Sequence, residues 1–392
     1  MKRILSTAIA FLLFASTATA FDAVGLILKV DAEMSRLQLR VGPQEITLPV
    51  AGGVKVLSEK DQPLVQGLRA VELKAGAEVT VTVDEQNGAL LITAIRLGRR
   101  IPIEQASVGF KPLNEMSASE KYKGEDGGLY GGGRNIPPDS HFAAAKRESA
   151  KITPLDADGK PSANGTIALV SISMSNATQE FSVFKQLADN DSRKSSSVNI
   201  VDCAQGGQAM AQWVDPKGRA WMEADRRLAA AKISPNQVQV VWIKLANITP
   251  GGDLNDHGRK LYSDTRTVID NARQRYPNLR IAYLGSRIYG GYANSPLNPE
   301  PYAYEGAYVV RWLIQDQIKG QPDLAGAPLL LWGPYFWGDG IVPRKSDALV
   351  WQRQDVLEDG IHPSDSGRRK VADMLLTFFT TDPLAVTWFV KK

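Results

Sequence analysis

The sequence contains very little histidine or cysteine, and this restricts the chemistry that the chain can support. Its 392 residues include one cysteine and three histidines. A single cysteine allows no disulfide within the chain, so packing must stabilise the fold. Cys203 is expected to be a small buried hydrophobic residue rather than a nucleophile. Because the histidines are scattered, we expect no zinc site, and the sequence indicates no cofactor.

Blocks of a single charge are equally scarce. The 46 basic and 42 acidic side chains give a formal net charge of +4 and are mixed along the chain. No basic block interleaved with aromatic residues occurs, which argues against nucleic acid as a partner. Beyond the first 20 residues no apolar run is long enough to cross a bilayer, so no membrane span is expected there. The pattern does not indicate an oligomeric state.

The first 20 residues have the pattern of a secretory signal peptide. Lys2 and Arg3 supply a positive start, residues 4–15 are apolar, and Ala18-Thr19-Ala20 fits the small-x-small cleavage pattern. We therefore expect removal of residues 1–20 and a secreted or periplasmic location. The competing interpretation is an uncleaved anchor. The shortness of the apolar stretch and the cleavage pattern favour removal.

Residues 21–100 predict a small all-β domain. Apolar runs at 26–30, 37–41 and 78–83 are typical of short strands, and Asn87-Gly88 between two such runs is a strong hairpin signal. We expect a small antiparallel barrel or sandwich. It carries no catalytic cluster, so an accessory for binding or packing and a purely structural appendage both remain open.

Residues 101–160 are expected to form an irregular, glycine-rich connecting region. The stretch Gly127–Gly133 holds too many glycines for a regular element, and no Gly-Lys-Ser/Thr follows it, which excludes a Walker-type phosphate loop. A long loop packed on the following domain fits this composition. His141 near its end is interpreted as a loop histidine rather than a ligand.

Strand and helix patterns alternate over residues 161–392, which indicates an α/β domain. Predicted strands lie at 166–172, 198–201, 238–243, 279–284 and 329–332, and predicted helices at 221–231, 261–276 and 304–318. Apolar strands in repeated strand–helix units imply a parallel sheet covered on both faces. Sites in such sheets form where loops leave the carboxyl ends of the strands.

Two segments far apart in the sequence supply the parts of a catalytic triad. Asp359 and His362 precede the last long helix, and a turn there can place the carboxylate against one imidazole nitrogen. Ser175 stands where the strand at 166–172 passes into a helix, a position that exposes its hydroxyl at the sheet edge. By itself Ser175 could equally be a helix N-cap, and His362 a surface histidine beside a capping acid.

Further donors follow the next two strands. Gly206 after the strand at 198–201 can bring a backbone N–H close to a reacting carbonyl, and the Asn247 amide after the strand at 238–243 can donate to the same oxygen. Each residue also has a purely structural interpretation, Gly206 as a turn residue and Asn247 as a loop cap. His257 is not the expected base, because it lies early in the strand–helix series and no triad can be assembled around it.

In these residues the sequence resembles the SGNH hydrolase superfamily over about residues 161–380. Ser175 matches the serine of block I, Gly206 the glycine of block II and Asn247 the asparagine of block III. Asp359 and His362 match the Asp-x-x-His of block V, which is the most specific part.

The resemblance implies a flavodoxin-like three-layer domain and metal-free hydrolysis of carboxylic esters or of acetyl groups on sugars. Block I departs from Gly-Asp-Ser, because Ser173 and Met174 precede Ser175. Block III has Leu245 in place of the glycine and Ile248 in place of the second acid. These departures indicate a divergent branch.

Arg287 and Tyr289 follow the strand at 279–284 and are weak candidates for substrate binding, by holding a carboxylate or stacking on a sugar. The reading from sequence is thus an exported serine esterase with a small-molecule or glycan ester as substrate. Two alternatives stay open. One is a non-catalytic carbohydrate-binding protein on the same fold, and the other is a transferase that passes an acyl group to a sugar.

Overall fold

The computed structural model describes residues 21–41, 44–59, 62–86, 89–98, 106–248 and 250–391. The expected signal peptide, residues 1–20, lies outside the described residues. The chain divides into two compact units, a smaller one formed by Met1–Ile103 with Asn294–Pro296 and a larger one formed by Glu104–Ala293 and Leu297–Lys392. In the part of the chain that the structure describes, no helix has the length and apolarity to cross a membrane.

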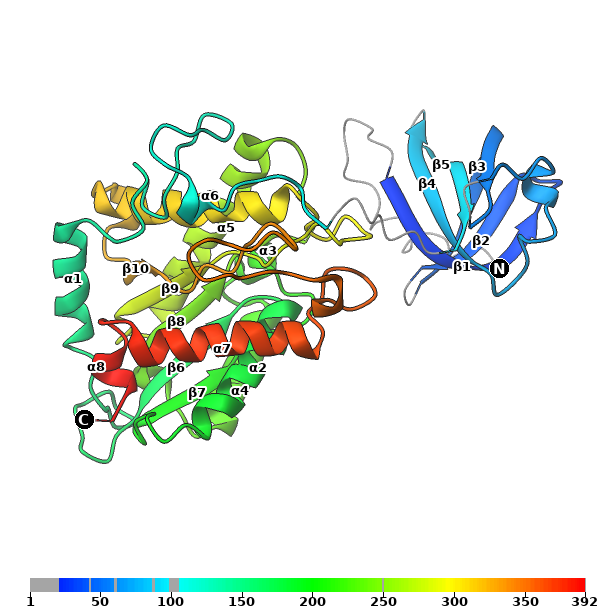
Figure 1. Cartoon of the computed structure of the whole chain (residues 1–392). Helices are drawn as coiled ribbons and strands as arrows, with labels where there is room; N and C mark the ends of the chain where they lie inside the picture. The colour runs from blue at the N-terminus through cyan, green and yellow to red at the C-terminus, as the bar shows by residue number, and fades with distance from the viewer. Residues whose placement is uncertain are drawn as a thin grey trace. The chain divides into compact units, whose positions relative to one another are not determined.

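The smaller unit is a closed five-stranded barrel, drawn in blue in Figure 1. Its strands are β1 (Phe21–Asp31), β2 (Arg36–Val41), β3 (Gln44–Leu57), β4 (Glu78–Gln86) and β5 (Ala89–Leu97), arranged in the order β1-β2-β3-β5-β4. The expectation of a purely antiparallel domain needs one correction, since β3 pairs with β5 in parallel. β3 and β5 run in the same direction, because β4 lies antiparallel to β1 and β5 lies antiparallel to β4. Closing the barrel in this strand order therefore pairs β3 with β5 in parallel.

The barrel core comes from alternating side chains of its strands. Val79, Val81 and Val83 of β4 are almost fully buried and point inward, as the period of two along a strand requires. β4 and β5 pair antiparallel up to Gln86 opposite Ala89. The Asn87-Gly88 turn that was expected to join them lies outside the described residues.

The larger unit is built on a five-stranded parallel sheet, as the alternating pattern predicts. Its strands are β6 (Ile167–Ile172), β7 (Val198–Asp202), β8 (Val238–Lys244), β9 (Ile281–Gly285) and β10 (Leu329–Trp332), in the order β10-β9-β8-β6-β7. All four strand pairs are parallel. The chain leaves β6 toward β7 and then returns to β8 on the other side, so the strand order reverses at β6. In open α/β sheets, ligands bind at such a switch point.

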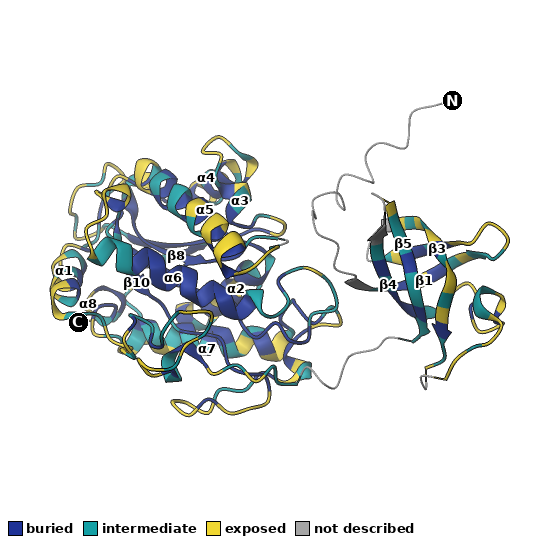
Figure 2. Cartoon of the chain, turned by 90° about the horizontal axis from the view of Figure 1, so that it is seen from above, coloured by how far each residue is buried: buried dark blue, intermediate teal, exposed yellow. Residues whose placement is uncertain are grey.

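Helices cover both faces of this sheet, which gives three layers. Figure 2 shows α4 and α5 on one side of the sheet and α7 on the other. α7 packs along α2. The helices are α2 (Ser175–Asp189), α3 (Met210–Trp213), α4 (Arg219–Ala230), α5 (Leu254–Arg275), α6 (Tyr302–Ile318) and α7 (Asp365–Thr381). The strands β6, β8 and β9 are buried along their whole length, as expected of a sheet covered on both faces.

The segment 101–160 differs from the irregular connection that was expected. It contains helix α1 (Asp139–Ser149), and Leu113 and Met116 join the hydrophobic core of the larger unit. His141 is not a loop residue, because it lies in α1, is buried, and its Nε2 is 2.9 Å from the carbonyl oxygen of Leu330. The abundance of glycine concealed a short helix whose buried residues are few.

The end of the chain is held beside the start of β7. After the short helix α8 (Val386–Phe389), the N–H of Lys391 donates to the Arg193 carbonyl, and the N–H of Ser195 donates to the Phe389 carbonyl, each at 2.8 Å. Both contacts lie just before β7 begins. The last described residues are therefore attached at the amino ends of the strands.

Candidate active site

Ser175 lies at the switch point of the sheet. β6 ends at Ile172, and α2 starts at Ser175 with Met174 as its N-cap. No side chain caps this helix, so the Ser175 hydroxyl is not used as a cap. The residue is half-buried, and its hydroxyl is directed to a histidine instead of the helix backbone. The first turn of α2 also directs unpaired backbone N–H groups toward the same edge.

His362 is carried by a tight loop that leads into α7. The loop is closed by a hydrogen bond of 2.7 Å from the N–H of Leu357 to the His362 carbonyl. Gly360 within it has a φ of +69°, and a Cβ there would lie 1.7 Å from the carbonyl oxygen of Tyr292. Only glycine fits both the left-handed backbone and this close approach. Ser364 then caps α7 by accepting from the N–H of Gly367.

Ser175, His362 and Asp359 form a continuous chain of hydrogen bonds. The Ser175 Oγ lies 2.7 Å from Nε2 of His362, and Nδ1 of His362 lies 2.5 Å from Oδ2 of Asp359. A carboxylate beside Nδ1 requires the proton on that nitrogen, which leaves the Nε2 lone pair to accept from the serine hydroxyl. The three residues thus have the geometry of a nucleophile, a base and a group that orients the base.

The Asp359 carboxylate is held in its ionised form. Partial burial acts to raise its pKa, but hydrogen bonds from the His362 ring and from the backbone N–H groups of Ile361 and His362 outweigh burial, so the pKa lies below its usual value. Those two N–H groups are 2.9 and 3.0 Å from Oδ1. The anion is therefore available to stabilise an imidazolium on His362.

The loop after β7 is tied to the serine turn. The N–H of Gln205 donates to the Ser173 carbonyl at 2.9 Å, which brings Gly206 to the neighbourhood of Ser175. Gly206 is exposed, and a Cβ there would meet nothing within 4 Å. The structure gives no steric reason for glycine at this position within the protein itself.

Asn247 follows β8, and both ends of its amide are engaged within the protein. Its Oδ1 accepts from the N–H of Ala211 at 3.0 Å, and its Nδ2 donates to Oδ2 of Asp264 at 2.8 Å. The amide therefore fastens the start of α3 to α5, and one N–H of Nδ2 remains for another acceptor. Its assignment as an oxyanion donor stays a prediction.

Arg287 and Tyr289, the candidates for substrate binding, are both buried, and their role in binding stays a prediction. Their exposed fractions are 3% and 1%, so neither is presented at the surface. Arg287 donates through Nη1 to Oδ1 of Asn176 at 2.9 Å. Tyr289 packs edge-on against Tyr292. Sequence reasoning placed them correctly after a strand but could not show that the core encloses them.

The remaining histidine and the cysteine are internal. Nε2 of His257 contacts Oε2 of Glu305, and the Glu305 carboxylate also accepts from Tyr122 at 2.6 Å. Cys203 is buried, as predicted, and burial raises the pKa of its thiol far above the usual value, so it is a poor nucleophile. Across the described ranges, no group of three or more His, Cys, Asp or Glu side chains could hold a metal ion.

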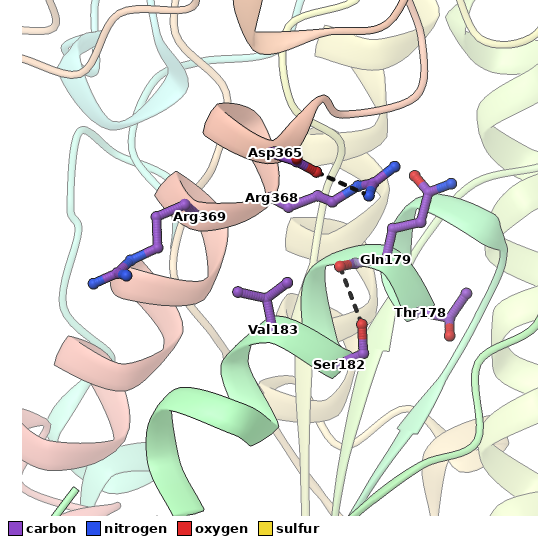
Figure 3. A pocket seen from close by; sticks show the side chains of 7 residues that line it. All are labelled: Thr178, Gln179, Ser182, Val183, Asp365, Arg368 and Arg369. Carbon is purple, nitrogen blue, oxygen red and sulfur yellow. Dashed lines mark hydrogen bonds and ion pairs between the residues drawn. The ribbon is translucent and has the colours of Figure 1, made fainter. Parts of the chain in front are cut away.

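Two pockets are lined by elements that carry residues of the candidate site. Figure 3 shows the first, about 410 Å³, between α2 and α7, and its walls include Thr178 and Gln179 of α2 and Arg368 of α7. The second, about 350 Å³, includes Asn247 and His257. Thr178 and Gln179 follow Ser175 by three and four positions in α2, a spacing that puts them on the serine's side of the helix.

One residue in the site was not selected from the sequence. Asn176, next to the serine, is 2% exposed, and its Nδ2 donates to the Ile361 carbonyl at 2.7 Å. A polar residue beside a nucleophile was its only signal in the sequence.

No protein-family model matches the chain, and no curated protein matches it in sequence. Solved structures similar to parts of it include a "putative acylhydrolase" from Bacteroides fragilis, at 12% identity and a TM-score of 0.32, with 64% of this chain and 100% of that one covered. The periplasmic domain of a lipopolysaccharide acetyltransferase from Salmonella Paratyphi A is similar at 13% identity and a TM-score of 0.31, with coverage of 55% and 83%. Apo-CusF from Escherichia coli is similar over 25% of this chain and 100% of its own length, at 13% identity and a TM-score of 0.17. Likeness at this level assigns neither a family nor an activity, so the function must be argued from the site.

Proposed function

We propose that the chain is a serine hydrolase of the SGNH type that cleaves carboxylic esters. The observation that carries this proposal is the hydrogen-bonded series Ser175–His362–Asp359, at 2.7 and 2.5 Å. Its position at the switch point of a parallel sheet supports it, because ligands of α/β sheets bind there. The resemblance of the five block residues to the SGNH pattern supports the reaction class.

The proposed reaction proceeds through an acyl-enzyme. Nε2 of His362 takes the hydroxyl proton of Ser175 as Oγ attacks the ester carbonyl, and the resulting imidazolium then protonates the leaving alcohol. A water molecule, deprotonated by the same nitrogen, attacks the acyl group and restores the serine. The backbone N–H of Ser175 at the start of α2, with Gly206 and the remaining N–H of Asn247, would face the oxyanion.

For the substrate we propose an acetyl or other short-chain ester, carried on a carbohydrate. This part of the proposal rests on the resemblance to the SGNH superfamily. A panel of acetylated glycans and short-chain esters, with product analysis in the presence and absence of a sugar acceptor, tests it. Free acid as the main product with an acceptor present supports a hydrolase, whereas acylated acceptor would identify a transferase.

A fluorophosphonate probe tests the mechanism without knowledge of the substrate. Such a probe reacts only with a serine that a base has activated. The purified protein should be labelled, and Ser175→Ala should abolish labelling while the protein stays folded. Ser173→Ala is the matched control, because it alters a serine two positions away whose hydroxyl is directed to the Lys244 carbonyl. Equal labelling of wild type and Ser175→Ala would refute the proposal.

We also propose that the protein is exported, on the pattern of residues 1–20. N-terminal sequencing of protein recovered from outside the cytoplasm should begin within a residue or two of Phe21. An intact Met1 on such protein would contradict removal of the leader.

A further inference from the structure

Asn176 joins the two chain segments that carry the serine and the histidine. Its amide nitrogen donates to the Ile361 carbonyl at 2.7 Å, one residue before His362. The residue itself directly follows Ser175 and is 2% exposed. A single buried side chain therefore spans from the neighbour of the nucleophile to the neighbour of the base. An amide in such a position has no water to replace a lost partner.

The other end of the same amide is held by a buried arginine. Oδ1 of Asn176 accepts from Nη1 of Arg287 at 2.9 Å, and Arg287 is 3% exposed. With Oδ1 receiving from a guanidinium, Nδ2 can only face the carbonyl of Ile361, so the orientation of the amide is fixed. Arg287 follows β9, a strand that contributes nothing else to the triad.

Arg287 is kept in place by charge as well as by packing. Burial lowers the pKa of its guanidinium, and the carboxyl groups of Glu180, Glu300 and Asp359 act in the opposite direction and offset part of this effect. Glu180 of α2 is itself fully buried and pairs with Lys244 at the end of β8. A buried charge such as that of Arg287 is costly unless neighbouring charges compensate for the loss of water.

We infer that Asn176 and Arg287 are positioning residues that hold the Ser175 turn and the His362 loop at hydrogen-bond distance from each other. This inference rests on the proposed function for its consequence in catalysis. The hydrogen bonds that Asp359 accepts come from its own loop, so they orient His362 in that loop but do not fix the loop against α2. The Asn176 amide provides that fixation from outside the loop.

The test replaces the amide group of Asn176 by a carboxylate group of nearly the same shape. Asn176→Asp keeps an acceptor for Arg287 but turns a carboxylate oxygen toward the Ile361 carbonyl, where two acceptors repel. Asn271→Asp is the matched control, because Asn271 of α5 is also buried and donates to two backbone carbonyls, those of Trp213 and Val214. We expect Asn176→Asp to lower kcat by about 10²-fold with little change in KM, as displacement of a catalytic group by about 1 Å does. Asn271→Asp should leave kcat unchanged.

Arg287→Lys provides a second variant, in case Asn176→Asp does not fold. It keeps the positive charge that faces Glu180 and Glu300 but shortens the reach to Asn176. It should lower kcat without raising KM. If folded Asn176→Asp, or Arg287→Lys where the former is unfolded, retains the wild-type kcat, the inference is wrong.

Nitrogen NMR of the imidazoles separates failure of this inference from failure of the proposed function. The chain has only three histidines, so the His362 signals can be assigned with a His362→Ala variant. The Nε2 shift of neutral His362 should report a hydrogen bond from Ser175 in wild type and its loss in Asn176→Asp. If wild type shows neither turnover nor labelling, the proposed function fails, and this shift alone decides the positioning role. An unchanged Nε2 shift in Asn176→Asp would overturn it.

Discussion

At the scale of single residues, the hydroxyl of Ser175 depends on a histidine 187 positions away. Neither side chain has another function in the fold that would explain the contact. Ser175 leaves its helix uncapped, and His362 is 24% exposed in its side chain. The pair therefore contributes little to stability, and its substitution should be visible in the reaction rather than in folding.

Ser175→Ala and His362→Ala should each lower kcat by on the order of 10⁶-fold, and the double variant should be hardly slower than either. The reason is that a nucleophile without its base, or a base without its nucleophile, performs no acyl transfer. Steady-state kinetics on an ester that wild type cleaves measures this, and circular dichroism checks the folding of each variant. Losses that multiply in the double variant would show that the two residues act independently.

The same scale shows where inference from sequence ends. Ser175, Asp359 and His362 could be selected because their residue types and their places before helices point to one chemistry. The engagement of Asn247 with Asp264 and the Asn176 amide between two segments could not be predicted. These two contacts depend on which loops lie next to each other at the edge of the sheet, and no local sequence pattern predicts which loops do so.

At the scale of elements, the loop that carries Asp359 and His362 is shaped by one glycine. Gly360→Ala places a methyl group 1.7 Å from the Tyr292 carbonyl oxygen, so the loop must move. We expect a stability loss greater than the ~1–2 kcal/mol that left-handed backbone costs, and a fall in kcat because the triad moves with the loop. Denaturant unfolding and steady-state kinetics measure the two effects.

Gly326→Ala is the control for that variant. Gly326 has a similar φ of +75°, but its Cβ would meet nothing nearer than the Arg273 Nη1 at 3.7 Å. It should show the backbone strain alone and keep the wild-type kcat. If Gly360→Ala behaves like Gly326→Ala, the close approach to Tyr292 does not shape the loop.

Elements with a clear pattern of apolar residues could be predicted from the sequence, and elements without such a pattern could not. The five strands of the parallel sheet were placed within about two residues, because their short length and their content of β-branched residues distinguish them from buried helices. α1 was hidden, since its eleven residues are mostly polar and follow a glycine-rich stretch. The parallel pairing of β3 with β5 was hidden too, because hairpin signals describe neighbours along the chain and not the closure of a barrel.

At the scale of the whole molecule, a buried carboxyl couples the stability of the larger unit to pH. Glu300 accepts hydrogen bonds from Trp337 and from the backbone of Gly290 and Tyr304. Burial raises its pKa from 4.5 to about 7, although these hydrogen bonds act in the opposite direction. The folded state thus binds this proton more tightly than the unfolded state does.

Because the pKa of Glu300 is higher in the folded state than in the unfolded state, its contribution to stability is fully present below pH 4.5 and decreases as the pH rises to about 7. Glu300→Gln should remove that slope, so the difference in the free energy of unfolding between wild type and variant should change in this pH range and be constant above it. All eight tryptophans lie in the larger unit, between Trp213 and Trp388, so their fluorescence follows the unfolding of that unit alone. A difference that does not depend on pH would contradict the raised pKa.

The attachment of the last residues beside the start of β7 has a practical consequence for handling the protein. The bonds from Lys391 to Arg193 and from Ser195 to Phe389 hold this end at the edge of the sheet opposite the one where Ser175 begins its helix. A linker to a solid support, or a dye joined through it, would emerge on the side away from the hydroxyl. Immobilisation by this end should therefore leave bulky polymeric esters able to approach, whereas attachment through the loops around Gly206 would obstruct them.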